Sequence, residues 1–192
     1  MRRASELRET KETRIQAELD LDGGAVRIST GIGFFDHMLT AFAVHGGFGL
    51  VLQVEGDLQV DCHHTVEDTG IVLGRAFAKA LGGFSGIQRY GSFYVPMDEA
   101  LVLAVCDLSG RPFLAFQADF TEARIGTYDS CMTEEFLRAF AMQAGITLHI
   151  KEEYGKNAHH VTEAVFKALG HALKIAVMRT DTDSPLSTKG VL

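Results

Sequence analysis

The sequence contains few cysteines and no long run of apolar residues. Three cysteines among 192 residues, an odd number, provide no framework of disulfides and suit a reducing compartment. No window approaches the roughly 18 apolar residues of a membrane-spanning helix. The first residues, Met1–Glu6, carry no apolar segment typical of an export signal. These absences predict a cytoplasmic protein without a membrane segment.

Positive charge is also scarce. The chain has 18 lysines and arginines against 25 aspartates and glutamates, for a net charge of −7. Nucleic acids and anionic membranes attract basic surfaces, so neither is expected as a partner. Hydrophobic residues make up 46% of the chain, which is enough to bury a full core as one domain or as two fused half-domains.

The most informative feature is a short motif, His-His-x-x-Glu, that occurs twice. It occupies residues 63–67 and 159–163, an offset of 96 residues in a chain of 192. Each copy follows a residue type that often caps helix N-termini, Asp61 or Asn157. Each copy then continues into apolar residues at helical spacing. Both motifs are therefore predicted to lie in the first turns of two equivalent helices.

The segments around the two motifs repeat in the same order. Alternation over residues 14–21 predicts a half-buried strand, and Asp22-Gly23-Gly24 predicts a turn into a return strand with Val26 and Ile28, forming a hairpin. The other predicted elements are a helix at 35–45, a strand at 50–54 and the first motif helix ending near Gly82, then strands at 99–108 and 113–118, a helix at 134–144, a strand at 146–150 and the second motif helix.

The predicted fold class is α+β, with a strand-strand-helix-strand-helix unit used twice and sheets packed against helices. Either unit alone would leave a sheet face and a helix face bare, so the two should share one core. Residues 1–192 are expected to form a single domain of two similar halves, about 1–91 and 92–192. The last 14 or so residues, 179–192, have little periodicity and are expected to form a tail.

Metal binding is the favoured interpretation of the repeated motif. Successive side chains on a helix diverge by about 100°, so adjacent histidines cannot easily bind one ion. The glutamate of each motif can share a face with one of its histidines. This geometry predicts two ions, each drawing a histidine from each motif helix. The positive end of the helix dipole is expected to disfavour imidazolium and keep these rings ready to ligate.

Two further histidines, His37 and His149, fit the same set. Six histidines and two glutamates would give each ion three nitrogens and one carboxylate, a mixture suited to Mn, Fe, Co or Zn. A hydrogen bond at a helix start would also explain His37, and an exposed strand position would also accept His149. His45 and His171 have no repeated partner and are assigned packing or surface roles. The predicted metal ligands are His37, His63, His64, Glu67, His149, His159, His160 and Glu163.

Ordered segments along the chain match a known family. They are Arg8-Glu9-Thr10-Lys11-Glu12-Thr13, Thr30-Gly31-Ile32, Phe35-Asp36-His37-Met38-Leu39, His63-His64-Thr65-Val66-Glu67-Asp68, Asp107-Leu108-Ser109-Gly110-Arg111-Pro112, Gly126-Thr127-Tyr128-Asp129, Thr147-Leu148-His149, Gly155-Lys156-Asn157-Ala158-His159-His160 and Ser187-Thr188-Lys189-Gly190. In these segments the chain resembles the imidazoleglycerol-phosphate dehydratases over essentially its whole length. Small departures are Cys62, where an acidic residue is usual, and Leu186, where proline is usual.

The resemblance implies a fold like the second domain of ribosomal protein S5 and two Mn²⁺ ions per subunit bound by the ligands above. It implies a homo-oligomer of 24 subunits whose metal sites are completed between chains. The implied reaction is the metal-dependent dehydration of D-erythro-imidazole glycerol phosphate to imidazole acetol phosphate, in L-histidine biosynthesis. The enzyme class would be a carbon-oxygen lyase, that is, a hydro-lyase.

The implied substrate would explain why two ions are needed, because its imidazole ring has two nitrogens that can each bind one ion. Its departing proton sits on an unactivated carbon, whereas an imidazole bound through both nitrogens becomes an electron-rich imidazolate that can expel the neighbouring hydroxyl. Glu12 is the favoured acid–base residue, with Glu67 and Glu163 as further catalytic candidates. Arg89 and Arg111 offer guanidinium forks to the phosphate. The full set of expected substrate contacts is Glu12, His37, His63, Glu67, Arg89, Arg111, His159, Lys167, Ser187, Thr188 and Lys189.

Two other classes of function remain open. A two-metal hydrolase of phosphate esters would more often use an Asp-rich ligand set than this histidine-rich one. A metal-storing or metal-clamped structural shell would not need Glu12 or the cations at Arg89, Arg111 and Lys189.

Overall fold

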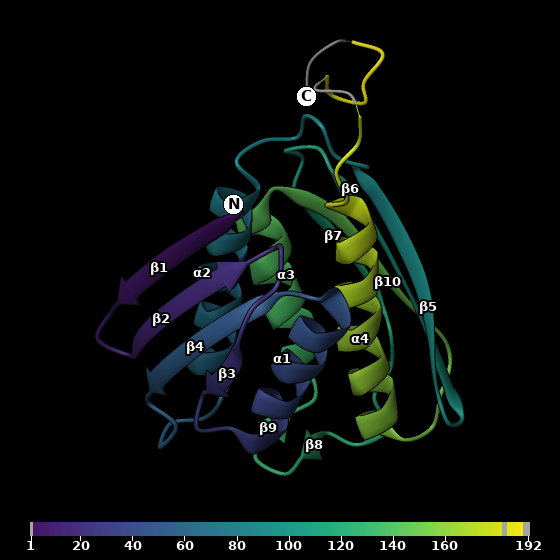
Figure 1. Cartoon of the computed structure of the whole chain (residues 1–192). Coiled ribbons are helices and arrows are strands. Elements are labelled where there is room, and N and C mark those ends of the chain that lie inside the picture. The colour runs from purple at the N-terminus through teal and green to yellow at the C-terminus, as the bar shows by residue number, and fades with distance from the viewer. Residues whose placement is uncertain (1, 182–183, 190–192) are drawn as a thin grey trace.

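Two four-stranded sheets enclose a layer of helices in the computed structural model of the chain, which describes residues 2–181 and 184–189 (Figure 1). The first half comprises β1 (Arg3–Glu9), β2 (Thr13–Asp20), β3 (Val26–Ser29), α1 (Gly33–Gly46), β4 (Gly49–Gly56) and α2 (His63–Leu81). The second half comprises β5 (Tyr90–Met97), β6 (Ala100–Leu108), β7 (Phe113–Gln117), the short strands β8 (Arg124–Ile125) and β9 (Tyr128–Asp129), α3 (Met132–Ala144), β10 (Ile146–Tyr154) and α4 (Ala158–Ala176).

The predicted duplication and the α+β fold class are confirmed. The strand order is β1-β2-β4-β3 in one sheet and β5-β6-β10-β7 in the other, so equivalent strands occupy equivalent places. The predicted helices and the central strands of both sheets are present close to their expected bounds. Their apolar residues recur at the helical or strand period because each element buries only one face.

The five-element unit was wrong in one respect, because each half begins with a further strand. β1 and β5 each pair along one side only, with β2 and β6. Edge strands bury little: the inward side of β1 includes the half-buried Glu6 and Arg8, and β5 carries Pro96. Neither strand therefore shows the alternation of apolar residues that a sequence pattern detects.

The predicted hairpin between residues 14–21 and Val26–Ile28 was also wrong. β3 pairs in parallel with β4, which itself occupies the edge of β2 that a hairpin would need. β3, α1 and β4 therefore form a crossover unit, as parallel strands require. The strand expected at 113–118 is β7, which pairs in parallel with β10 and not with the preceding strand β6. A turn-forming Asp-Gly-Gly segment is compatible with either connection.

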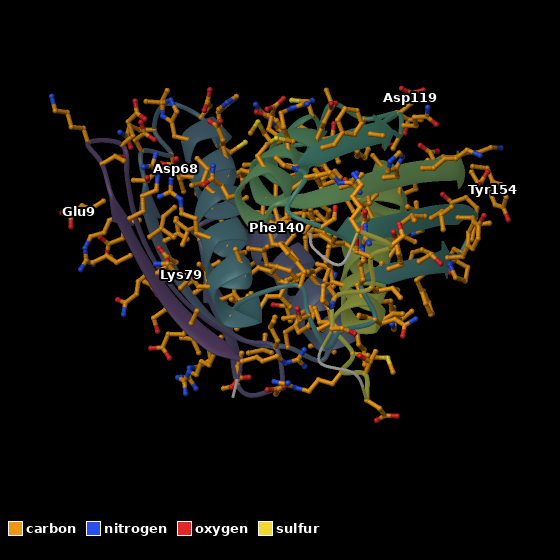
Figure 2. The ribbon with its side chains drawn as sticks, turned by 90° about the horizontal axis from the view of Figure 1, so that it is seen from above. Glu9, Asp68, Lys79, Asp119, Phe140 and Tyr154 are labelled. Carbon is orange, nitrogen blue, oxygen red and sulfur yellow. The ribbon has the colours of Figure 1, made fainter. Side chains whose placement is uncertain are left out.

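The two halves share one core because each helix of one half packs against a helix of the other half. α2 packs against α3, and α4 packs against α1, so each half covers a helix of the other. Gly74 of α2 and Gly170 of α4 are equivalent in the repeat. A Cβ on either would lie 2.6 Å from a backbone oxygen of the partner helix, that of Phe140 or Phe42. Figure 2 shows Phe140 between the two sheets, where side chains from both halves meet.

The tail lies along the segment that follows α2. Isolated strand bridges join Ile87 to Arg179 and Ser85 to Pro185. Residues 182–183 and 190–192, which include Gly190 of the tail motif, lie outside the described residues. No helix among the described residues is long and apolar enough to cross a membrane.

Candidate metal sites and a cationic pocket

The N-terminal parts of α4 and α1 bring three candidate ligands together. Glu163 Oε2 lies 3.3 Å from His159 Nε2 and 3.4 Å from His37 Nε2. Asn157 caps α4 by accepting hydrogen bonds from the backbone N–H groups of His159 and His160, as predicted. At α1, the carboxylate of Asp36 accepts from the backbone and hydroxyl of Thr30 and so fixes the approach to His37.

The spacing of these atoms suits a metal ion. The ligand atoms of His37, His159 and Glu163 all lie within 4.8 Å of one another. Two ligand atoms on one ion, with bonds of about 2.1 Å, lie about 3.0 Å apart at octahedral and about 3.4 Å apart at tetrahedral angles. Imidazole nitrogen together with carboxylate oxygen suits borderline divalent ions. The residues present therefore fit the expected ion.

The charge of Glu163 is held by its neighbours. The side chain is 7% exposed. Burial would favour the neutral acid, but Lys167, whose Nζ lies 2.7 Å from Oε1, and then His37 hold the pKa of Glu163 below its usual range. Lys167 thus lies beside the group formed by His37, His159 and Glu163, which we call the metal-type cluster.

The first motif forms a second, smaller group on α2. His63 Nε2 lies 3.6 Å from Glu67 Oε2, the same i,i+4 relation that joins His159 to Glu163. Asp61 lies one residue before the N-cap position, Cys62, and accepts a hydrogen bond from the His63 N–H. Among the described residues, no histidine of this motif joins the ligands on α4. Within the described part of one chain, the ligands of the two motif helices that the sequence assigned to a shared ion are therefore not brought together.

The second histidine of each motif points to a different carboxylate. His64 Nδ1 lies 3.0 Å from Asp57 Oδ2, and His160 Nδ1 lies 2.7 Å from Glu99 Oε2. The hydrogen bond that Asp57 accepts raises the pKa of His64, and the one that Glu99 accepts raises the pKa of His160. At these two histidines a neighbouring carboxylate favours the protonated ring, which is opposite in direction to the effect expected of the helix dipole.

Glu12 lies in the tight connection between β1 and β2. The hydroxyl of Thr10 accepts hydrogen bonds from the backbone N–H groups of Glu12 and Thr13. Asp68 of α2 binds Arg8 and Thr13, which fastens the connection to the motif helix, and Figure 2 shows Asp68 between α2 and the first sheet. Glu12 Oε1 consequently lies 3.9 Å from His64 Nε2. The structure brings this candidate acid–base group to a candidate metal ligand.

His149 lies apart from both groups, on the outward face of β10. Its neighbours in register are Val105 of β6 and Ala115 of β7. Its ring centroid is 6.4 Å from that of Phe113. His45 and His171, which were assigned packing or surface roles, contact each other at 3.0 Å, and the His171 ring stacks on Phe93.

A cavity of about 900 Å³ lies at the other end of the molecule, against the tail. It is lined by Arg89, Tyr90, Ser109, Gly110, Arg111, Pro185, Leu186, Ser187, Thr188 and Lys189. Five of the six residues expected to bind phosphate thus meet in one place, and the sixth, Lys167, does not reach it. Guanidinium, ammonium and hydroxyl groups around one cavity can bind a phosphate from several sides.

Arg89 is fixed unusually firmly. Its side chain forms two hydrogen bonds with Asp107, at 2.7 and 3.1 Å, and Asp107 also binds Arg111 at 3.2 Å. Burial would favour the neutral acid, but Arg89 holds the pKa of Asp107 below its usual range. The backbone of Arg89 has φ of 70°, and its N–H donates to the carbonyl of Ala176 at the end of α4. Strained backbone that hydrogen bonds hold in place is typical of functional positions.

Sequence patterns assigned no role to three carboxylates of the site: Asp57, Glu99 and Asp107. Their partners lie seven, 61 and 18 residues away in the chain, so no short motif joins them. One weak signal existed for Asp107, since it is a charged residue at the end of the apolar strand β6.

Comparison with known proteins identifies the family. The model of the imidazoleglycerol-phosphate dehydratase family matches residues 30–173. The chain belongs to this family. Imidazoleglycerol-phosphate dehydratases from Desulfotalea psychrophila and Carboxydothermus hydrogenoformans are 54% and 55% identical to it, over all of this chain and 96% and 100% of theirs. The expected enzyme class, a hydro-lyase of histidine biosynthesis, is confirmed by this membership of the dehydratase family.

Solved structures of the family agree with the fold. The crystal structure of the dehydratase from Staphylococcus aureus matches with a TM-score of 0.85 at 39% identity, over 93% of this chain and 99% of that one. The dehydratase from Pyrococcus furiosus, in complex with (S)-C348, matches with a TM-score of 0.86 at 39% identity, over 97% and 100%.

Proposed function

We propose that this chain dehydrates D-erythro-imidazole glycerol phosphate to imidazole acetol phosphate, using two divalent ions per subunit, with Mn²⁺ the expected ion. The observation that carries the proposal is the presence of two kinds of site in one chain: the cluster of His37, His159 and Glu163, and a cationic cavity. These are the two chemistries that an imidazole ring and a phosphate require. The shared helical core supports treating residues 1–192 as one domain.

The two kinds of site lie too far apart to serve one substrate molecule within a chain. His159 and Glu163 lie in the first turns of α4, whereas Arg89 is bonded to Ala176 at its last residue. Ala176 lies 13 positions after Glu163, which corresponds to about 20 Å of helix. Figure 1 shows the start of α4 at the opposite end of the molecule from the yellow C-terminal segment. Three carbons between ring and phosphate cannot bridge that distance, so two chains would supply one site.

The outer face of the second sheet supports contact between chains. Tyr90, Tyr94, Val105 and Phe113 lie exposed on β5, β6 and β7, around His149 of β10. The equivalent face of the first sheet carries mostly charged and polar residues, including Arg14, Gln16, Gln53 and Glu55. An apolar face of this kind is typical of a surface that another subunit covers. His149 would then complete a metal cluster of that subunit in a homo-oligomer, for which the family resemblance suggests 24 chains.

The residues divide the chemistry between them. When bound, the two ions would supply Lewis acidity to the imidazole ring of the substrate. His37, His63, His64, His149, His159 and His160, with Glu67 and Glu163, would hold the ions. Glu12 would take or return the proton at the carbon next to the departing hydroxyl, with Glu67 and Glu163 as further acid–base candidates. Arg89, Arg111, Ser187, Thr188 and Lys189 would bind the phosphate, and Lys167 would join them from a second chain.

One preparation tests the proposal. The Mn²⁺-loaded protein should convert imidazole glycerol phosphate to a ketone, and a chelator should stop the reaction. Fully metallated and assembled protein that forms no ketone would exclude the dehydratase. Release of inorganic phosphate from simple phosphate esters would instead favour a two-metal hydrolase, and the absence of any turnover would favour a metal-clamped shell.

A further inference from the structure

Asp57 and Glu99 contact candidate metal ligands without being candidate ligands themselves. Each accepts a hydrogen bond from Nδ1 of the second histidine of a motif. Asp57 accepts from His64 at 3.0 Å, and Glu99 accepts from His160 at 2.7 Å. In both motifs the first histidine behaves differently and directs its Nε2 to the motif glutamate. The arrangement therefore distinguishes two histidine positions in the same way in both halves of the chain.

Hydrogen bonds that involve no histidine hold both carboxylates in place. The second oxygen of Glu99 accepts hydrogen bonds from the backbone N–H groups of Asn157 at 2.8 Å and Lys156 at 3.3 Å. The backbone N–H of Asp57 donates to the carbonyl of Glu12, and its carbonyl accepts from Val60, so its short side chain has little freedom. The side chain of Asp57 is only 16% exposed. Such acceptors can orient a ring rather than follow it.

The two carboxylates occupy places that the repeat does not relate. Asp57 directly follows β4, whereas Glu99 directly precedes β6, and the position equivalent to Glu99 in the first half is Glu12, which directly precedes β2. A contact inherited passively from the duplication would use equivalent positions. The same histidine atom instead meets a carboxylate from a different element in each half, which indicates a chemical requirement at that atom.

From this geometry we infer that Asp57 and Glu99 are positioning residues, which hold the Nδ1–H tautomer of His64 and His160 and so present Nε2 to the metal. A carboxylate behind a ligating imidazole fixes the tautomer and orientation of the ring and increases the basicity of its other nitrogen. The inference rests on the proposed function in one respect, namely that His64 and His160 ligate a divalent ion.

The test measures Mn²⁺ affinity in the full chain by competition with a chelator, without substrate. Asp57→Ala and Glu99→Ala should each weaken binding by about 10- to 100-fold, the usual cost of losing such a partner. Glu99→Gln should restore part of the loss, because its amide oxygen still accepts from Nδ1–H. Glu134→Ala is the matched control, since Glu134 is an exposed carboxylate that binds Arg138 and no histidine. The control should bind like the wild type.

A double-mutant cycle separates positioning from structural support. If Glu99 acts through His160, then Glu99→Ala should add little to the loss already caused by His160→Ala. Equal and additive losses would overturn the inference, because Glu99 would then act only through the start of α4. Wild-type affinity in Asp57→Ala and Glu99→Ala would overturn it as well. Failure of the wild-type chain itself to bind Mn²⁺ would overturn the proposed function, which distinguishes the two failures. Should Glu99→Ala fail to fold, Glu99→Gln in the same cycle decides the question.

Discussion

Substitution of Glu12 tests the proposed proton transfer directly, because Glu12 is the favoured acid–base residue. Its carboxylate lies 3.9 Å from His64 Nε2 in a connection fixed by Thr10 and Asp68. Glu12→Gln should lower kcat for dehydration by about 100-fold or more, the usual contribution of a general acid or base. Mn²⁺ content and assembly should not change, because the amide is isosteric. Ketone formation, measured beside metal content, checks this.

Glu9→Gln is the control for Glu12→Gln, since Glu9 lies at the end of β1 and is exposed. It should retain wild-type turnover. Near-normal turnover in Glu12→Gln would remove Glu12 from the mechanism and leave Glu67 and Glu163 as the acid–base candidates.

Asp107 links stability to the cationic cavity. It is the ion-pair partner of Arg89, which is 6% exposed, and it also binds Arg111. Asp107→Asn leaves Arg89 buried without its counter-ion and should lower the free energy of unfolding by about 3 kcal/mol. The KM for substrate should also rise, because both arginines lose their alignment. Denaturant unfolding and steady-state kinetics measure the two effects.

The exposed pair of Glu134 with Arg138 provides the comparison for Asp107→Asn. Glu134→Gln should cost no more than about 0.5 kcal/mol, since exposed helical pairs contribute little. Similar losses in Asp107→Asn and Glu134→Gln would mean that Asp107 has no special part in holding Arg89.

At the level of residues, the sequence identified the groups of the site whose spacing follows a helical turn. The motif predicted that Glu163 lies beside one of its two histidines, three or four residues away, and in the structure this histidine is His159. The contact of His160 with Glu99 joins residues 61 positions apart and depends on how β6 meets α4. No local rule predicts it, because it exists only after the sheet has formed.

At the level of elements, the exchanged helix packing makes a symmetrical prediction. Gly74→Ala and Gly170→Ala each place a Cβ 2.6 Å from a partner backbone oxygen, so the helices must separate. Each change should lower the free energy of unfolding by about 1–3 kcal/mol, the usual cost of overpacking. Thermal or denaturant unfolding of the metal-free chain measures it.

Gly33→Ala is a control for the two packing glycines, because it is helical and nothing lies within 4 Å of its added Cβ. It should be neutral or slightly stabilising. If Gly74→Ala were harmless while Gly170→Ala were costly, the two helix contacts would not be equivalent.

The positions of individual strands in the sheets explain which parts of the fold the sequence did not predict. Helices and central strands repeat apolar residues because they bury a face against the core. The edge strands β1 and β5 bury too little to show that pattern. The partner of β3 is decided by β4, which follows it in the chain and takes the place beside β2. Strand order of this kind is a property of the whole sheet, which periodicity does not contain.

At the level of the whole molecule, the metal-type cluster and the cationic cavity lie at opposite ends of α4, so the proposed function requires two chains for each site. Two inactive variants should then rescue one another. Arg111→Ala impairs only the cavity and Glu163→Gln only the cluster, and each assembled alone should have little activity. Mixed as metal-free chains and reassembled with Mn²⁺, they should recover up to about one quarter of wild-type activity, because random assembly pairs an intact cavity with an intact cluster.

The control mixture combines Arg111→Ala with Lys189→Ala. Both residues line the same cavity of one chain, so every cavity in that mixture lacks one cation and no activity should return. Recovery in the control would show that the cavity is itself shared between chains. Without recovery in the first mixture, although both variants assemble, cluster and cavity would have to serve the same substrate from one chain. That would contradict the separation along α4 on which the two-chain site depends.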